Sequence, residues 1–219
     1  MLTKIFKGDQ AHKSRFHDEK GNLINAAGLV YLPHCAATTL LRVSTGWRPI
    51  LPWISYRAMQ KINKILTPDS VLMEFGSGMS TVWYSQRCKK VVSIEDNEQW
   101  YTKIDKEFKR RKINNVDYNL LMNENYYQLD EFADASFDFI VVDGSERGKC
   151  VASALKKLKP KGYVYLDNSD KYPNEEEGDI RIAEKLLLQA VKERSGTVQY
   201  FVDLVPTYLV VTQGMLVQL

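Results

Sequence analysis

The 219-residue chain contains only three cysteines, Cys35, Cys88 and Cys150, which lie far apart and form no Cys-x-x-Cys pair. So sparse a set excludes a disulfide framework and a cysteine-based zinc site, and it is typical of a reducing compartment. The chain also has little excess charge. Its 30 Lys and Arg residues against 27 Asp and Glu residues give a net charge of +3, which is too small for a dedicated polyanion-binding protein.

Long hydrophobic runs are absent as well. The N-terminal residues contain no apolar core of a secretory signal peptide, and no stretch approaches the roughly 18 apolar residues of a membrane span. We therefore expect a soluble, cytoplasmic protein without a membrane partner. What is present is an ordinary globular composition, 44% hydrophobic and 26% charged, in a length that suits one domain with an extension.

Residues 1–54 show weak periodicity, with many polar residues first and a glycine and two prolines near the end. We interpret this segment as an N-terminal extension that packs on the main domain or covers its pocket. Trp47 and Trp53 lie in it and suit either buried anchors or a pocket wall. Buried anchors are the preferred interpretation, because large aromatic residues are usually buried.

Residues 55–219 alternate between strand and helix patterns, β–α repeated five times and then a closing hairpin. Strands are expected at 71–75, 90–94, 116–122, 137–142, 163–166, 197–204 and 208–213, and helices at 55–66, 80–87, 98–111, around 151–158 and at 175–194. The link between the last two strands is so short that they must pair antiparallel. The predicted fold class is α/β: a doubly wound, mostly parallel, seven-stranded sheet with a C-terminal antiparallel hairpin.

A glycine-rich loop, E-F-G-S-G-M-S, follows the first predicted strand. Gly76 and Gly78 allow a tight turn and let a ligand approach main-chain N–H groups near a helix start, although such a pair also occurs in plain turns. A dinucleotide fingerprint requires a third glycine where this chain has Thr81. The acidic Glu74 before the loop would repel a pyrophosphate and suits a ligand that carries positive charge.

The second predicted strand is followed by two carboxylates, Glu95 and Asp96. In sheets of this topology, a carboxylate at this position can accept both hydroxyl groups of a ribose. The alternative is that it caps the next helix. We assign Glu95 to binding, as the first residue beyond the strand, and Asp96 or Asn97 to capping.

Further carboxylates follow the fourth and fifth predicted strands, at Asp143 and at Asp167, next to Asn168. Because these strands are expected to be neighbours, the side chains converge where open α/β sheets bind ligands. Two clustered carboxylates repel each other, and a divalent ion with a preference for oxygen ligands relieves that repulsion. Arg147 or a lysine of the extension can relieve it without a metal.

Taken in order along the strands, E-F-G-S-G, S-I-E, V-V-D-G and Y-L-D-N resemble the motifs of class I S-adenosylmethionine-dependent methyltransferases. The resemblance covers about residues 55–219 and includes the closing hairpin. It implies that the glycine loop cradles the methionine part of the donor, that Glu95 holds its ribose, and that the segment near Asn123 meets its adenine. The donor-binding set that it implies is Glu74, Gly76, Ser77, Gly78, Ser80, Glu95, Asp96, Asn123 and Asp143.

Asp143, Asp167 and Asn168 also resemble the metal triad of the catechol and caffeoyl-CoA O-methyltransferases, which implies a Mg²⁺ ion that orients the acceptor. We therefore expect methyl transfer from S-adenosylmethionine to a small-molecule hydroxyl, with Asp143 as the catalytic residue and with or without Mg²⁺. The alternatives are an NAD(P)-dependent oxidoreductase and a non-catalytic nucleotide-binding scaffold. No nucleic-acid partner is expected, an oligomer is compatible with the sequence, and the acceptor is not identified.

Two further groups of residues are weaker candidates for a functional role. A basic run occupies the end of the helix expected at 98–111, and it is interleaved with acidic residues, so we interpret it as a solvated face. Its members are Lys103, Lys106, Lys109, Arg110, Arg111 and Lys112. The histidines of the extension, His12, His17 and His34, are interpreted as surface or structural residues, with a role as general base only if the extension folds over the pocket.

Overall fold

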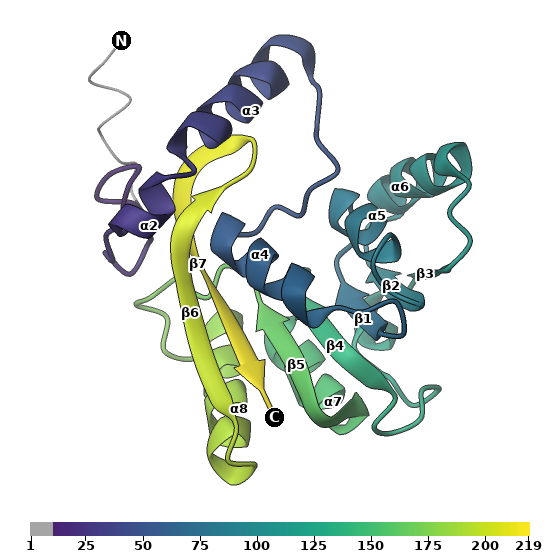
Figure 1. The fold of residues 1–219 in the computed structure, drawn as a ribbon. Coiled ribbons are helices and arrows are strands. Elements are labelled where there is room, and N and C mark those ends of the chain that lie inside the picture. Colours follow the sequence, from purple (N-terminus) through teal and green to yellow (C-terminus); the bar gives the residue numbers. More distant parts are fainter. Residues whose placement is uncertain (1–10) are drawn as a thin grey trace.

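The structure is a computed structural model that describes residues 11–219, and its centre is one seven-stranded sheet (Figure 1). The strands are β1 (Val71–Phe75), β2 (Lys90–Glu95), β3 (Val116–Leu120), β4 (Phe137–Val142), β5 (Leu158–Leu166), β6 (Thr197–Val205) and β7 (Tyr208–Gln218). They lie in the order β3-β2-β1-β4-β5-β7-β6. The first five are parallel, and β7 runs antiparallel to both β5 and β6. The predicted fold class is confirmed.

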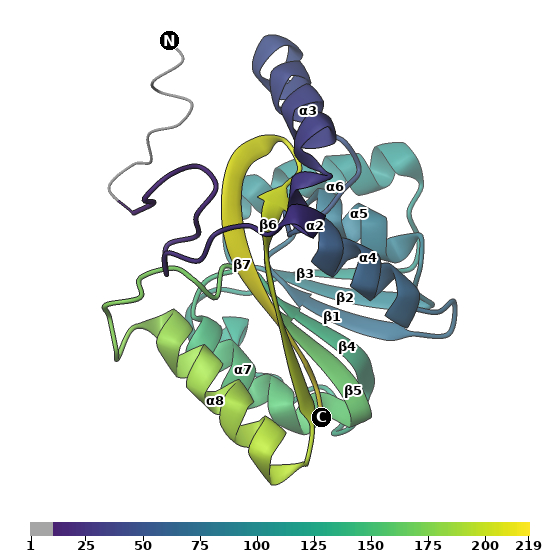
Figure 2. The ribbon, with the colours of Figure 1, turned by 60° about the vertical axis from the view of Figure 1, so that its left-hand side comes forward.

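Helices cover both faces of the sheet, and Figure 2 shows α4, α5 and α6 on one face and α7 and α8 on the other. The helices are α2 (Ala26–Leu29), α3 (Leu32–Thr45), α4 (Tyr56–Ile65), α5 (Met79–Ser85), α6 (Glu98–Arg111), α7 (Arg147–Lys157) and α8 (Asp179–Glu193), with a 3₁₀ helix, η1 (Asn123–Tyr126). Successive strand residues face opposite sides: Leu72 packs with the α4 side and Met73 with the α7 side. Burial on both faces explains why the strands are continuously apolar.

Three of the expected elements differ from the structure. No α-helix follows β3, so the predicted five-fold β–α repeat is wrong at that point, and only η1 connects β3 to β4. The strand expected at 163–166 begins earlier, because β5 also includes residues 158–162, where the pairing with β4 is irregular and Lys161 has a φ of 64°. Helix α8 begins at Asp179 and not at 175. The Asp179 carboxylate accepts hydrogen bonds from the main-chain N–H groups of Arg147 and Gly148, at 2.6 and 2.8 Å, and so caps α7.

The extension contains two helices that its weak periodicity did not predict, and the longer one, α3, packs on the turn between β6 and β7 (Figure 1). The Cys35 thiol donates to the carbonyl of Val205 at 3.2 Å. The Thr38 hydroxyl accepts from the main chain of Thr207 at 3.2 Å, and Arg42 donates to the Thr207 carbonyl at 3.1 Å. These contacts fix α3 to the hairpin, so the described part of the extension is integral to the fold.

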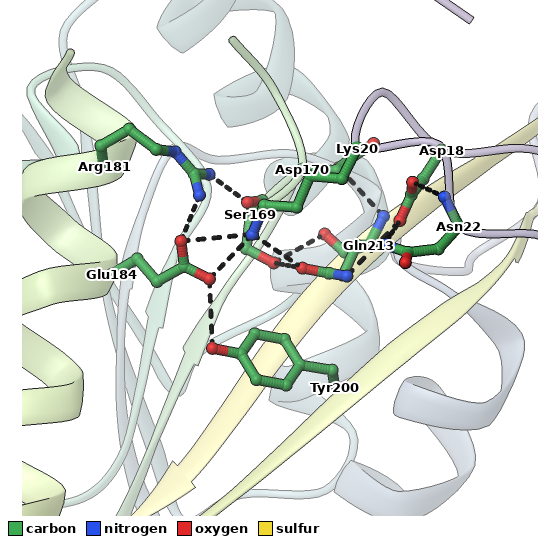
Figure 3. A network of polar contacts seen from close by, with 9 residues as sticks. All are labelled: Asp18, Lys20, Asn22, Ser169, Asp170, Arg181, Glu184, Tyr200 and Gln213. Carbon is green, nitrogen blue, oxygen red and sulfur yellow. Dashed lines mark hydrogen bonds and ion pairs between the residues drawn. The ribbon is translucent and has the colours of Figure 1, made fainter. Parts of the chain in front are cut away.

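A buried polar network fixes the start of the described extension to the C-terminal half of the sheet (Figure 3). Asp18 is fully buried and accepts from the side chain of Gln213 on β7 at 3.4 Å. Lys20 pairs with Glu184 of α8 at 2.9 Å. Asp170, in the loop after β5, accepts from the main-chain N–H of Gln213 at 3.0 Å. Residues 1–10 of the predicted extension lie outside the described residues. In residues 11–219, no helix is both long and apolar enough to cross a membrane.

Candidate active site

The glycine loop after β1 contains one glycine that the backbone requires. Gly76 has a φ of +86°, a left-handed conformation that side chains rarely adopt. A Cβ there would lie 2.9 Å from the main chain of Gly144, at the end of β4. The Gly76 N–H also donates to the Ile94 carbonyl at 2.8 Å. Gly76 therefore allows the ends of β1, β2 and β4 to meet.

The second glycine of the loop has a different environment. Gly78 precedes α5 with a φ of 174°, an extended conformation open to any residue. A Cβ at Gly78 would meet only Ser80, with its hydroxyl oxygen 3.6 Å away, which is ordinary van der Waals contact. Nothing in the fold requires a glycine here. The space in front of Gly78 is free for a ligand.

Glu74 lies beneath the loop. It is fully buried, and its carboxylate accepts hydrogen bonds from the hydroxyl groups of Ser80 and Thr81, both at 2.5 Å, and of Ser93, at 3.1 Å. Burial raises the pKa of Glu74 to about 7, although the three hydroxyl groups lower it. The geometry favours a brace that holds the loop over the direct ligand contact that we expected from the sequence.

The raised pKa of Glu74 predicts a pH-dependent stability. The folded state holds a proton on Glu74 up to about pH 7, whereas the unfolded chain releases it near 4.5. The free energy of unfolding should therefore be highest below pH 4.5 and should fall as the pH rises through 7. Relative to Glu74→Gln, which cannot titrate, we expect the wild type to lose on the order of 3 kcal/mol over this range. Urea unfolding at several pH values measures the difference, and parallel curves for the two proteins would contradict it.

Glu95 is the last residue of β2, and not the first beyond it as we expected, and it holds the loop from the other side. Its carboxylate accepts from the Ser77 N–H at 2.9 Å, from the Ser77 hydroxyl at 2.7 Å and from the Asn97 N–H at 3.1 Å. The Trp100 ring donates to the Ser77 carbonyl at 2.7 Å, and the Tyr118 hydroxyl lies 2.6 Å from that of Ser77. The Asn97 side chain accepts a hydrogen bond from the main-chain N–H of Trp100 and so caps α6. Glu95 therefore has no capping role.

A cavity of about 480 Å³, which we call the tyrosine cavity, lies between the ends of β2, β3 and β4. Two residues predicted from the sequence, Asp96 and Asn123, share it, and the Asp96 carboxylate accepts from the Ser145 hydroxyl. Tyr126 and Tyr127 form part of its wall. Sequence reasoning missed these two tyrosines and Ser145. The only available signal was their position, just beyond the third and fourth strands.

A larger cavity of about 640 Å³, the tryptophan cavity, joins the loop to the extension. Segment 46–53, loop residues 77–80 and the face of α6 from Trp100 to Arg111 form its walls, and Asp143 also lines it. Trp47 and Trp53 are 49% and 41% exposed and lie in the wall. The preferred prediction of buried anchors is therefore wrong for both, because the two tryptophans line a cavity opposite the loop after β1 and α6 instead of inserting into the core.

Asp143 and Asp167 do converge after β4 and β5, and Arg147 lies with them. The guanidinium of Arg147 is 3.4 Å from the Asp143 carboxylate and donates to the carbonyl of Gly144 at 2.9 Å. It also donates to the main-chain carbonyl of Asp167. Burial raises the pKa of Asp143, and the charge of Arg147 partly offsets this rise. Burial also raises the pKa of Asp167 well above its usual range, and the negative charge of Asp143 raises it further.

The predicted metal triad does not fit this arrangement. Arg147 already faces Asp143, and Asp167, which is buried, accepts from the Tyr165 hydroxyl at 3.2 Å. In the described part of the chain, no group of three or more His, Cys, Asp or Glu side chains is arranged to hold a metal ion. Asn168, the third residue of the predicted triad, has a left-handed φ of 48°. Positive charge near the carboxylates comes from the guanidinium of Arg147, with a smaller contribution from Lys171.

Two of the extension's histidines, His17 and His34, make their contacts outside the site. His34 lies 2.9 Å from the Tyr56 hydroxyl, and His17 lies 2.7 Å from the Ser14 hydroxyl. Neither residue lines the tyrosine cavity or the tryptophan cavity. Both therefore match the structural role that we expected.

The glycine loop after β1, the carboxylate that ends β2, the carboxylates after β4 and β5 and the closing hairpin define the class I methyltransferase type of α/β fold. Residues 73–166 match the family model described as "Methyltransferase domain". This part of the chain is a methyltransferase domain. The predicted family and enzyme class are confirmed, and the oxidoreductase alternative is not supported.

Solved structures agree on the fold. The O-methyltransferase TomG from Streptomyces achromogenes aligns with a TM-score of 0.62 at 13% identity, over 89% of this chain and 96% of that one. An O-methyltransferase from Bacillus cereus aligns with a TM-score of 0.61 at 13% identity, over 86% and 99%. An rRNA methylase from Streptococcus thermophilus aligns with a TM-score of 0.54 at 16% identity, over 78% and 96%. A search of curated protein sequences finds no significant match.

Proposed function

We propose that the enzyme transfers the methyl group of S-adenosylmethionine to a hydroxyl oxygen of a small molecule. The main support for this proposal is the free space in front of Gly78, which opens to the tryptophan cavity beside Asp143. In this proposal, residues 55–219 supply the donor site. The extension, residues 1–54, supplies one wall of the acceptor site through its segment 46–53.

The donor is placed along the carboxyl edge of the sheet. Its methionine part lies against the loop from Gly76 to Ser80, in the free space in front of Gly78. Its ribose lies at Glu95, whose buried carboxylate is held in position by Ser77. Its adenine enters the tyrosine cavity, with Asp96 and Asn123 in the wall.

The reaction is an in-line displacement. The acceptor oxygen forms a bond to the methyl carbon as the carbon–sulfur bond breaks, and the bonding electron pair stays on sulfur, which becomes the neutral thioether of S-adenosylhomocysteine. The hydroxyl proton passes to the carboxylate of Asp143, which lines the tryptophan cavity and whose pKa burial raises toward the range of a useful base. The protein otherwise contributes alignment.

We propose that this site works with Arg147 in place of the Mg²⁺ ion that the family resemblance implied. The guanidinium provides the positive charge that two neighbouring carboxyl groups need, and it is held by the carbonyl of Gly144 and that of Asp167. No reaction step is assigned to a metal ion.

The direct test is a pair of calorimetric titrations, with S-adenosylhomocysteine and with NAD⁺. We expect saturable binding of S-adenosylhomocysteine and none of NAD⁺. Binding of NAD⁺ alone would overturn the proposed function.

Glu95→Ala should weaken the binding of S-adenosylhomocysteine by about 1–3 kcal/mol, or about 5- to 150-fold, which is the usual loss of a charge-assisted hydrogen bond. The matched control is Asp105→Ala, which removes a carboxylate that pairs with Lys109 on α6 outside both cavities. Calorimetry gives the affinity and thermal unfolding gives the stability. A lower melting temperature with unchanged affinity would limit Glu95 to holding the loop and would assign the ribose to Asp96.

A further inference from the structure

The tryptophan cavity brings together segments of the extension and of α6 that are distant in the sequence. Its position matters because it begins at Gly78 and Asp143, where the methyl group of the donor is placed, and continues along α6 to Arg111. In Figure 1, the connection from α3 to α4, which carries segment 46–53, descends on the side of the molecule where α5 and α6 lie. A volume of about 640 Å³ is in the range of sites that bind small molecules.

The charge of this cavity is unbalanced. Its cationic residues are Arg48, Lys103, Arg110 and Arg111, and its carboxylates are Glu107 and Asp143. Both carboxylates are already paired: Glu107 with Arg110 and Arg111, at 2.7 and 3.1 Å, and Asp143 with Arg147.

Two of the cations are free to bind an anion. Arg48 lies over the ring of Trp53 at 4.9 Å, and Lys103 lies over the ring of Trp100 at 4.7 Å. Neither has a carboxylate within ion-pair distance among residues 11–219. The interpretation of the basic run as a solvated face is therefore incomplete, since Lys103, Arg110 and Arg111 line a cavity.

The same cavity exposes flat apolar surface. Trp47 leaves 49% of its surface uncovered, although large aromatic residues are usually buried. The ring of Trp53 is already occupied, because the guanidinium groups of Arg42 and Arg48 lie 4.8 and 4.9 Å from its centroid. A ring placed against an indole gains contact area and stacking energy. Ring faces beside unpaired cations are complementary to a ring that carries a negative charge.

We propose that the methyl acceptor is a small anionic molecule, a ring bearing a carboxylate or a phosphate, and that it binds in the tryptophan cavity. Its ring lies against Trp47, and its anionic group faces Arg48 and Lys103. This proposal rests on the proposed function, because the acceptor must lie beside the donor. It goes further by naming the chemical class of the acceptor and the residues that select it.

The test is calorimetric titration of the protein loaded with S-adenosylhomocysteine. The anionic probes are 4-hydroxybenzoate, glucuronate and glucose 1-phosphate, and the neutral counterparts are phenol and glucose. We expect at least one anionic probe to bind at least tenfold more tightly than its neutral counterpart. The three probes distinguish a carboxylate from a phosphate and an aromatic ring from a sugar.

The double variant Arg48→Gln/Lys103→Gln should weaken the bound anionic probe at least tenfold and leave the affinity for S-adenosylhomocysteine within twofold. The matched control, Lys106→Gln/Lys109→Gln, removes the same charge from α6 outside the cavity, and it should change neither affinity.

Three results would overturn the proposal. The first is that no anionic probe binds more tightly than its neutral counterpart, or that no probe binds at all. The second is an equal loss of affinity in the two double variants. The third is binding of a short RNA oligonucleotide in preference to every small probe. In each case, retained binding of S-adenosylhomocysteine leaves the proposed function standing. Loss of that binding in the wild type would reject both proposals.

Discussion

Gly78→Val is expected to abolish the binding of S-adenosylhomocysteine while the protein remains folded. A Cβ at this position meets only the Ser80 hydroxyl, at 3.6 Å, and the extended φ of 174° suits any residue. The valine side chain therefore projects into the space that the methionine part of the donor requires. Calorimetry should detect no binding, and thermal unfolding should show at most a small loss from the poorer helix cap, about 1 kcal/mol or less.

The neighbouring glycine provides the contrasting control. Gly76→Ala places a Cβ 2.9 Å from the main chain of Gly144 at a left-handed φ of +86°. Its cost should appear as lost stability, on the order of 1–3 kcal/mol or more. Retained affinity in a folded Gly78→Val protein would show that the loop is only a turn, and the donor would have to bind elsewhere.

Arg147→Gln should lower the free energy of unfolding by about 2–4 kcal/mol, because it leaves the buried carboxyl group of Asp167 and the half-buried one of Asp143 without their cation. The side chain of Arg147 is buried and contacts the Asp143 carboxylate and the carbonyls of Gly144 and Asp167, so its loss also leaves these acceptors without a donor. Urea unfolding near neutral pH measures the change.

The control for Arg147 is two residues away on the same helix. Lys149 is exposed and pairs with exposed Glu146, so Lys149→Gln should change stability by about 0.5 kcal/mol or less. A small effect of Arg147→Gln would argue against Arg147 as the charge that balances the site. Saturable binding of Mg²⁺ to the protein loaded with S-adenosylhomocysteine would also argue against this role, provided that Asp167→Asn abolished the Mg²⁺ binding.

Much of the fold could be predicted from the sequence, because it depends on local patterns. Strands buried on both faces must be continuously apolar, and amphipathic helices must place apolar residues three or four positions apart, so β1 and α6 were predicted within a residue of their observed ends. The short link between β6 and β7 permits only a hairpin. The glycine loop and the carboxylates after β2, β4 and β5 were visible because they directly follow apolar strands.

Other features depended on how distant segments pack. The choice between burial and exposure for Trp47 and Trp53 depended on the path of the extension, and α3 was missed because much of its stability comes from the β6–β7 turn and not from its own apolar pattern. The inward direction of Glu74 depended on the hydroxyl groups of Ser80 and Ser93 beneath the loop.

By itself, the sequence determined the class of fold, the loop and the edge of the sheet at which ligands bind, since each follows from residues that are adjacent in the chain. The tertiary structure decided what surrounds that edge. It placed Arg147 against Asp143, and it combined segment 46–53 with the basic face of α6 in one cavity. Residues about 50 positions apart form that cavity, and no local pattern encodes their meeting, because it depends on the packing of the whole chain.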